Sequence, residues 1–360
     1  MKSKLSLPRW SIITPILAWL LYYGKTLEFG GIYDLFLAFA LIGTVLAAVH
    51  HAEVIAHRVG EPAGTLVLAI AITIIEVALI VSLMLAGGAE TAALARDTVF
   101  AAIMIILTGI IGLCLLVGGY RYQEQQFGRF GVSAALVTLT AISILTLVLP
   151  NYTTSVPGPI YNTSQLIFVG IISLVLYGTF VMVQTVRHRA YFLPEKVDSK
   201  TEAHVDPPSN QVTILSTVLL LVCLGAVVLL AKMLAPTIEG FVVDMGAPES
   251  LVGVIVAAVI LLPEGLAALR AAKKNRLQIS LNLALGSALA SIGLTIPVVA
   301  LVSIFTGLTI TLGIDTKSTL LLILSLFTVA LSFGTGRTTI MQGVVLLVLF
   351  AVYLFTTIVP

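Results

Sequence analysis

Long apolar stretches recur from one end of this 360-residue chain to the other. Segments such as Val218 to Leu230 and Leu320 to Leu331 are almost wholly apolar, and charged residues make up 10% of the sequence, against about a quarter in a soluble domain. Inside a bilayer every backbone amide must be bonded within the protein, so about twenty apolar residues in a row indicate a membrane-spanning helix. A transmembrane barrel would instead alternate apolar and polar residues. The pattern predicts an all-α polytopic membrane protein.

Turn residues and charges divide the apolar sequence into about eleven predicted transmembrane helices. The first follows Met-Lys-Ser-Lys and resembles a signal peptide, but no small-residue cleavage site comes after it, so we expect an uncleaved helix. The predicted spans are residues 9–24, 32–57, 62–87, 97–119, 131–149, 163–188, 212–233, 248–271, 278–304, 318–333 and 338–358.

Lysine and arginine gather in the connections on one side of these spans. If the N-terminus is cytoplasmic, the other side holds only Lys25 and Lys317 in its loops and Arg96 and Lys232 at helix ends, four of the 19 basic residues. Cytoplasmic loops carry the excess of positive charge in membrane proteins. The distribution therefore predicts a cytoplasmic N-terminus and an external C-terminus.

The longest polar connection runs from Arg187 to Gln211 and leaves six predicted spans before it and five after it. We interpret it as a solvated cytoplasmic linker, with a regulatory segment as the alternative. One extra helix and two five-helix repeats is the division that this count favours. The predicted parts are an N-terminal transmembrane helix (1–30), a first repeat (31–188), the linker (189–211) and a second repeat (212–360).

Each half contains an apolar run with a single glutamate. GTLVLAIAITIIEVALI begins at Gly64 and holds Glu76, and GVIVAAVILLPEGLAAL begins at Gly253 and holds Glu264. Because five is odd, the second repeat enters the membrane from the opposite side to the first. Such inverted repeats place substrate sites near the midplane of many transporters. The sequence therefore predicts that Glu76 and Glu264 meet there.

A carboxylate inside the bilayer persists only where it faces a protein interior, a cavity or a cation. The alternative for Glu76 is a protonated side chain that hydrogen-bonds a neighbouring helix. Pro263 removes a backbone donor just before Glu264, so we expect it to bend or break the helix and free carbonyl oxygens beside the carboxylate. Hard cations such as Ca²⁺ take this mixture of carboxylate and neutral oxygens.

A polar stripe runs along the next predicted span, on one helical face. It consists of Asn282, Gly286, Ser287 and Ser291. Asn282 and Ser287 are candidate neutral ligands for a cation or proton held at Glu264, and Ser291 is a secondary candidate. The alternative is a packing seam, because small residues let membrane helices approach closely.

Other polar residues lie near span ends and are secondary candidates. Asp97 follows Arg96, and an interfacial ion pair between them is simpler than a role at an outer mouth. Glu53 and His57 share a helical face, and since histidine titrates near neutral pH the pair could admit protons or sense pH. Anchoring to lipid headgroups is the alternative.

The runs GEPAGTLVLAIAITIIEVALI and ILLPEGLAALRAAKKNRLQISLNLALGSALASIGLTIP resemble the two repeat motifs of bacterial calcium/proton antiporters of the calcium:cation antiporter superfamily. The nearest group is the sodium(potassium)/calcium:proton exchangers of bacterial inner membranes. The resemblance implies two inverted five-helix repeats plus an extra N-terminal helix, an inner (plasma) membrane location, and a transported cation at Glu76 and Glu264. It also maps the Gly-Ser element of the family onto Gly286 and Ser287.

The sequence departs from the wider family pattern before each glutamate. Ile72-Thr73 and Ile260-Leu261 stand where many relatives have Gly-Asn, and Thr73 is kept as a secondary candidate ligand. These departures remove cation ligands. The sequence therefore leaves the transported cation open between Ca²⁺ and Na⁺ or K⁺.

The predicted function is secondary active antiport, in which cytoplasmic Ca²⁺, Na⁺ or K⁺ is exchanged for external protons by alternating access. A cation channel or an uncoupled cation transporter could use the same glutamates and is the alternative. An intramembrane enzyme is not expected, because no Ser-His pair, HExxH motif or paired cysteines occurs inside a span. The expected partners are inorganic cations, protons and the lipid bilayer. We expect no cofactor and no nucleic acid, and the oligomeric state is left open.

Overall fold

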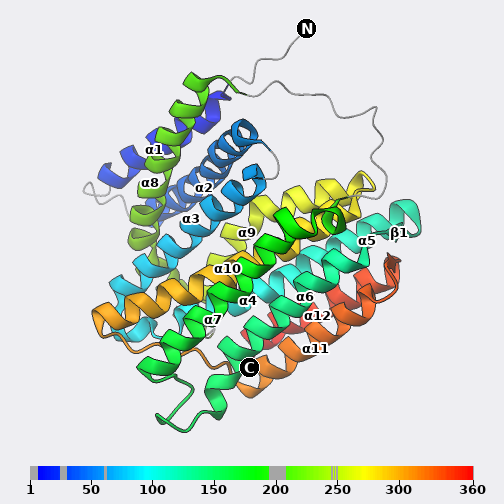
Figure 1. Ribbon diagram of the computed structural model, residues 1–360. Helices are drawn as coiled ribbons and strands as arrows, with labels where there is room; N and C mark the ends of the chain where they lie inside the picture. The colour runs from blue at the N-terminus through cyan, green and yellow to red at the C-terminus, as the bar shows by residue number, and fades with distance from the viewer. Residues whose placement is uncertain are drawn as a thin grey trace. The chain divides into compact units, whose positions relative to one another are not determined.

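The computed structural model describes residues 7–24, 31–60, 63–193, 208–244, 246, 248 and 250–359. Eleven long helical segments run through these residues, one at each predicted span (Figure 1), which confirms the all-α prediction. Before the linker they are α1 (Arg9–Gly24), α2 (Gly31–Val59), α3 (Ala63–Gly87), α4 (Leu94–Met104) continuing through η3 (Ile105–Ile110) into α5 (Ile111–Tyr122), α6 (Arg129–Ser143) continuing through η4 (Ile144–Val148) and η5 (Leu149–Tyr152), and α7 (Thr163–Met182) with η6 (Val183–Arg187).

Five helices follow the linker: α8 (Asn210–Asp244), α9 (Ser250–Lys273), α10 (Leu277–Thr306), α11 (Thr316–Phe333) and α12 (Ile340–Ile358). Short 3-10 helices lie at η2 (Gly88–Thr91) and η7 (Arg189–Phe192). Two short strands, β1 (Gln125–Gln126) and β2 (Arg337–Thr338), pair antiparallel and were not predicted. The part of the linker prediction that falls on residues 194–207 lies outside the described residues.

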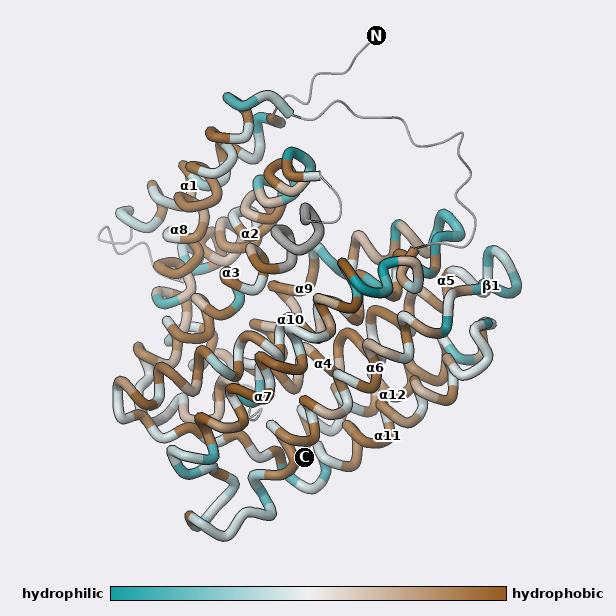
Figure 2. The backbone as a smooth tube through the Cα atoms, viewed as in Figure 1, coloured by the Kyte–Doolittle hydropathy of each residue, from teal (hydrophilic) through white to brown (hydrophobic). Residues whose placement is uncertain are grey.

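Within the described part of the chain, nine helical segments are long and apolar enough to cross a bilayer, and α3 contains the further apolar stretch Ile70–Leu85. Figure 2 shows hydrophobic residues along α11 and α12 and hydrophilic residues around β1. The helix α1 has 16 residues, fewer than the roughly twenty that span a membrane. The prediction that α1 crosses the bilayer stays a prediction.

Polar residues begin several of these helices by accepting bonds from exposed backbone amides. Asn162 caps α7, since its Oδ1 accepts from the Gln165 amide at 2.8 Å and the Gln165 side chain accepts from the Asn162 amide at 3.0 Å. Asp315 caps α11 by accepting from the Ser318 amide at 2.6 Å. The sequence thus specifies where these apolar helices start.

Proline does not interrupt the helix that carries Glu264. The helix α9 continues from Ser250 to Lys273 through Pro263. Of the two expected effects of Pro263, the break is therefore wrong and the bend stays a prediction; proline is tolerated inside membrane helices where surrounding groups satisfy the freed backbone carbonyl. Proline still has no amide proton, so the Val259 carbonyl four residues earlier lacks its usual helical donor.

The described helices form two compact units. In the first, α1, α2 and α8 pack on one another. His51 is fully buried and its Nε2 lies 3.0 Å from the Ser11 carbonyl oxygen of α1. Trp19 donates from its indole nitrogen to the Val222 carbonyl at 3.2 Å. These bonds hold the N-terminal helix against α2 and α8. The helix α3 also belongs to this unit.

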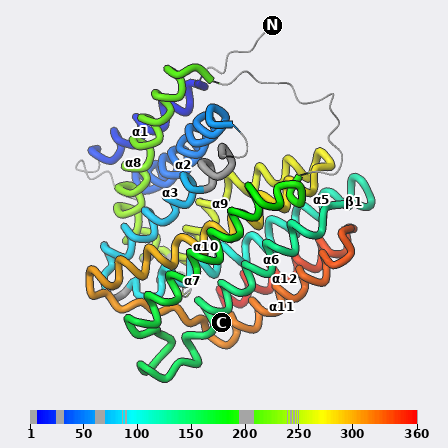
Figure 3. Tube along the Cα trace, viewed as in Figure 1, coloured from blue at the N-terminus to red at the C-terminus, as the bar shows by residue number. Residues whose placement is uncertain are grey.

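The second unit contains α4 to α7 and α9 to α12. Figure 3 shows α9 and α10, in yellow and orange, passing among the cyan and green helices that precede the linker; α9 packs on α4, and α10 packs on α7 and α6. Glycines allow the closest contacts. A Cβ on Gly293 of α10 would lie 2.8 Å from Tyr177 of α7, and one on Gly112 of α5 would lie 3.1 Å from Leu346 of α12.

Each unit draws helices from both sides of the linker. The two units are compact bodies and do not mark the limits of the predicted repeats at 31–188 and 212–360. The repeat division stays a prediction.

Candidate functional site

Glu76 lies in the middle of α3, in the first unit, and is 4% exposed. Its neighbours in the chain, Ile75 and Val77, are buried, and so is Thr73, one helical turn earlier. Glu76 is therefore buried within the protein, and its depth in the membrane stays a prediction. A carboxylate in such surroundings is stable only if it is protonated or compensated by a cation or a hydrogen bond.

Glu264 lies in α9, in the second unit. The residue is partly exposed as a whole, whereas both of its carboxylate oxygens are buried. The preceding Pro263 leaves the Val259 carbonyl without a helical donor, as described above. A carboxylate and a carbonyl thus occur within one turn and a half of the same helix, and both are oxygen donors that suit a hard cation.

A tight hairpin sets the depth of α10 relative to Glu264. The two helices pack together and are joined at Asn275, whose φ of 58° is tolerated by asparagine better than by most residues. The amide of Asn275 donates to the Ala272 carbonyl at 3.1 Å, which closes the turn. Glu264 precedes Asn275 by eleven residues and Gly286 follows it by eleven. Gly286 and Ser287 therefore lie at the depth of Glu264.

Gly286 also has open space beside its α-carbon. A Cβ added to Gly286 would meet no heavy atom within 4 Å. The Gly-Ser pair is thus not a close helix contact at the glycine, which weakens the alternative of a packing seam at that position. Ser291, four residues further along α10, is 1% exposed.

Asn282 lies four residues nearer the hairpin than Gly286, about 6 Å along the helix axis. Both atoms of its amide form hydrogen bonds. Its Nδ2 donates to the Phe192 carbonyl at 2.6 Å, and its Oδ1 accepts from Gln278 at 2.9 Å. Asn282 therefore anchors η7, where the linker begins, and its role as a cation ligand stays a prediction.

A π-helical segment lies beside α9 close to Glu264. Within the otherwise continuous helix from Leu94 to Tyr122, residues Ile105–Ile110 form the π-helix η3. A Cβ on Gly265 would lie 3.1 Å from the Ile110 side chain. π-helical segments inside α-helices occur frequently at functional sites. The π-helix could not be predicted, because nothing in an apolar run such as IILTGI distinguishes π-helical from α-helical hydrogen bonds.

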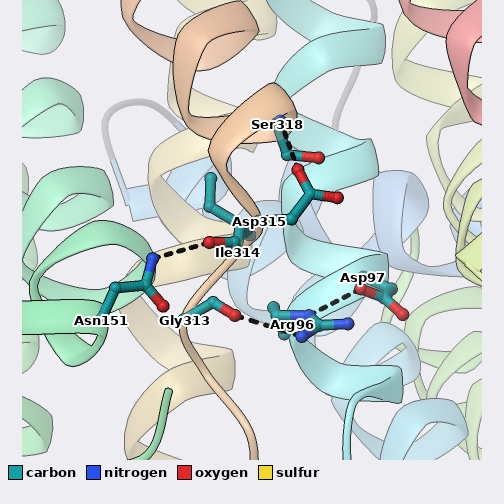
Figure 4. A network of polar contacts seen from close by, with 7 residues as sticks. All are labelled: Arg96, Asp97, Asn151, Gly313, Ile314, Asp315 and Ser318. Atoms are coloured by element: carbon teal, nitrogen blue, oxygen red, sulfur yellow. Dashed lines mark hydrogen bonds and ion pairs between the residues drawn. The ribbon is translucent and has the colours of Figure 1, made fainter. Parts of the chain in front are cut away.

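Asp97 forms the ion pair that the sequence favoured. Arg96 Nε donates to Asp97 Oδ1 at 2.7 Å, and Arg96 Nη1 donates to the Gly313 carbonyl at 3.1 Å (Figure 4). The two side chains are 21% and 15% exposed. A positive charge thus already compensates Asp97.

Glu53 and His57 lie on the exposed side of α2 near its end. Glu53 Oε2 is 3.9 Å from His50 Nδ1, a weak contact at the surface. The buried histidine of this helix is His51, which the sequence alone did not single out. The proposed roles of Glu53 and His57 in pH sensing stay predictions.

The two glutamates belong to different compact units, and so do Thr73 and Ser287. The structure brings Glu264, Ser287 and Ser291 into one α9–α10 hairpin. The meeting of Glu76 with Glu264 stays a prediction.

Comparison with known proteins gives relatives along almost the whole chain. A putative ionic transporter of Sinorhizobium fredii, y4hA, is 48% identical over 89% of this chain and 87% of its own length. The sodium-potassium/proton antiporter ChaA of Escherichia coli is 36% identical over 96% of this chain and 95% of its own length. The solved structure of the Ca²⁺/H⁺ antiporter protein YfkE has a TM-score of 0.70, covering 97% of this chain and 99% of that one at 18% identity, which shows a shared fold.

The family described as sodium/calcium exchanger protein matches residues 32–186 and 215–359, one stretch on each side of the linker. This match confirms the resemblance to cation antiporters and agrees with the many apolar spans. The chain is a multi-pass membrane protein and a transporter rather than an enzyme, and it belongs to the sodium/calcium exchanger protein family.

Proposed function

We propose that this protein exchanges cytoplasmic Ca²⁺, Na⁺ or K⁺ for external protons, with Glu76 and Glu264 as the groups that bind either ion. The observation that carries the proposal is one buried glutamate in an apolar helix of each half of the chain: Glu76 is 4% exposed and the carboxylate oxygens of Glu264 are buried. Ser287 is the first proposed neutral ligand, and Thr73 and Ser291 are further candidate oxygens. Asn282 is the weakest candidate, because both atoms of its amide already form hydrogen bonds.

Cations and protons compete for the same negative charges, and this competition couples the cation flux to the proton flux. Two carboxylates in a low dielectric are neutralised either by one divalent cation or by two protons, and leaving both charged and empty is unfavourable. A cation that enters therefore displaces protons, and protons that enter displace the cation. Neither ion crosses unless the site opens alternately to the two sides of the membrane.

Alternating access follows from two repeats that move against each other around a fixed site. The two stretches that match the family, 32–186 and 215–359, support the proposed repeats at 31–188 and 212–360. We place the protein in the inner membrane with a cytoplasmic N-terminus, on the strength of the lysine and arginine distribution.

The cation is the part of the proposal that experiment must decide. ChaA of Escherichia coli is named a sodium-potassium/proton antiporter, and YfkE is named a Ca²⁺/H⁺ antiporter. A panel of NaCl, KCl and CaCl₂ applied to proteoliposomes that contain a pH indicator dye would separate these possibilities. We expect a cation-dependent proton movement for at least one of the three.

The test of the site is the isosteric removal of each carboxylate. Glu76→Gln and Glu264→Gln should each reduce cation-driven proton movement by at least 100-fold, because one group that exchanges a proton for a cation is lost. Glu124→Gln is the matched control: Glu124 is 44% exposed and forms a surface ion pair with Arg337 at 3.2 Å. Normal exchange in either buried variant would refute the proposed site.

The same vesicles distinguish an antiporter from a channel. A channel passes cations down their gradient without a stoichiometric change in internal pH. Cation uptake that is measured by isotope and is unaccompanied by proton movement would favour the uncoupled alternative.

A further inference from the structure

The connector between α10 and α11, residues 307–315, has no regular secondary structure and yet is buried along much of its length. Ile310, Leu312 and Ile314 are 4%, 1% and 2% exposed. Loops usually run over the surface, because a buried loop must satisfy its backbone polar groups. This connector is therefore held by specific partners.

Three backbone amides of the connector donate to neighbouring segments of the same unit. Thr311 donates to the Ala92 carbonyl at 3.0 Å, Gly313 to Pro159 at 2.9 Å and Ile314 to Leu147 at 2.9 Å. A Cβ on Gly313 would overlap Asn151 and Pro159, so only glycine fits there. The connector is fixed among the turn before α4 that contains Ala92, the segment η4 that follows α6, and the loop before α7.

Two side chains complete this arrangement by donating to connector carbonyls (Figure 4). Asn151 Nδ2 donates to the Ile314 carbonyl at 2.6 Å, and Arg96 Nη1 donates to the Gly313 carbonyl at 3.1 Å. The Arg96 guanidinium reaches Gly313 while its Nε is held by Asp97 at 2.7 Å. Asp97 thus orients Arg96 toward the connector.

Asp97, which orients Arg96, also contacts α9, the helix that carries Glu264. A Cβ on Gly253 of α9 would lie 2.8 Å from the Asp97 carbonyl carbon and 2.9 Å from the Thr98 nitrogen. The backbones of α4 and α9 therefore meet at this point with no room for a side chain. Glu264 lies eleven residues further along α9, about 16 Å away at the usual helical rise.

We propose that Arg96 is a positioning residue for ion exchange: its bonds to Asp97 and Gly313 hold the start of α4 against the connector, and through the Asp97–Gly253 contact they set the position of α9 and hence of Glu264. Arg96 itself binds no transported ion. Asp97, being compensated by Arg96, acts in this contact and not as a cation ligand. The inference rests on the proposed function of Glu264.

Two independent substitutions test the proposal in proteoliposomes. Gly253→Ala inserts a methyl group between α9 and α4, and Arg96→Gln removes the charge and the guanidinium fork. We expect each to raise the KM for the transported cation at least fivefold while the maximal rate falls less than twofold. Gly178→Ala is the matched control for the first, because a Cβ on Gly178 of α7 would meet nothing within 4 Å.

Arg96→Lys keeps a cationic donor at the same place and should restore at least half of the lost affinity. If Gly253→Ala does not fold, Arg96→Gln and Arg96→Lys still decide the matter. A fall in melting temperature with an unchanged KM in Arg96→Gln would show a purely structural clamp and overturn the proposal.

Failure here is distinguishable from failure of the exchange site. Normal exchange by Glu264→Gln would remove the proposed function itself. Loss of exchange in Glu264→Gln, together with a wild-type KM in both Arg96→Gln and Gly253→Ala, would remove only the positioning role of Arg96.

Discussion

The helices that carry Glu76 and Glu264 are alike in composition and differ in what surrounds the carboxylate. Glu76 is almost completely buried between Ile75 and Val77, with Thr73 as the polar side chain one turn away. Glu264 follows Pro263 and shares its depth with Gly286 and Ser287 across a tight hairpin. If both glutamates bind the ion as proposed, the two halves contribute equal charge but unequal numbers of neutral oxygens. We infer that α3 supplies mainly the carboxylate, whereas the α9–α10 hairpin supplies most of the coordination.

Shortening each glutamate by one methylene should give the largest difference between the two regions. We expect Glu76→Asp to lower the exchange rate about 100-fold, since a displacement of about 1 Å is costly where fewer neutral oxygens are proposed to share the coordination. Glu264→Asp should lose only about tenfold, because neighbouring oxygens can compensate. Initial rates of proton movement in proteoliposomes measure both. Equal losses in the two variants would contradict the inferred asymmetry.

Removing a neutral ligand from the α9–α10 hairpin should have the second-largest effect on exchange. Ser287→Ala is expected to raise the KM for the cation about tenfold, which corresponds to about 1.4 kcal/mol of binding free energy. Ser332→Ala on α11 serves as its control, since that hydroxyl donates to the Thr328 carbonyl at 2.7 Å within its own helix. An unchanged KM in Ser287→Ala would indicate that Gly286 and Ser287 serve helix packing and not cation binding.

Giving the Val259 carbonyl of α9 its helical hydrogen-bond donor should have a smaller effect on the KM. Pro263→Ala gives the Val259 carbonyl a helical partner and so withdraws an oxygen from the site. We expect the KM to rise about threefold while the melting temperature increases, because proline is about 3 kcal/mol less favourable than alanine inside a helix. Cation titrations and thermal melts in detergent check the two halves of this prediction. A more stable variant with an unaltered KM would exclude the carbonyl as a ligand.

Asn282 should show the smallest effect on exchange. Asn282→Ala removes the bonds to the Phe192 carbonyl and to Gln278, which should reduce stability by about 1–2 kcal/mol and change the KM less than twofold. Thermal unfolding followed by exchange assays on the folded fraction would measure this. A tenfold rise in KM would instead make Asn282 a ligand, as the sequence pattern predicted.

Much of the fold was predictable because membrane insertion imposes a long apolar run on every helix. All eleven predicted spans correspond to helices, and the two glutamates stand out because a charge in such a run is expensive. The ion pair between Arg96 and Asp97 was also predictable, since adjacent opposite charges at a helix end attract at short range. The division into repeats and the orientation in the membrane rest on pattern alone and stay predictions.

Other features depended on contacts between distant segments. The sequence around Pro263 allowed a bent or broken helix, whereas α9 runs without a break through this residue. No local sequence pattern marks the π-helix η3 or the pairing of β1 with β2, two strands that lie far apart in the chain. Asn282 looked like part of a ligand stripe, whereas its amide holds the carbonyl of Phe192, ninety residues away in the chain.

By itself, the sequence determined that this protein is a bundle of membrane helices with one glutamate in an apolar run of each half, because hydrophobic length and buried charge are local properties. Tertiary structure decided which oxygens share the depth of Glu264. It also decided that α4 packs closely on α9 at Gly253 and that Arg96 donates to a carbonyl of the α10–α11 connector. Those relations depend on where separate helices pack, and distance along the chain carries no information about distance in space.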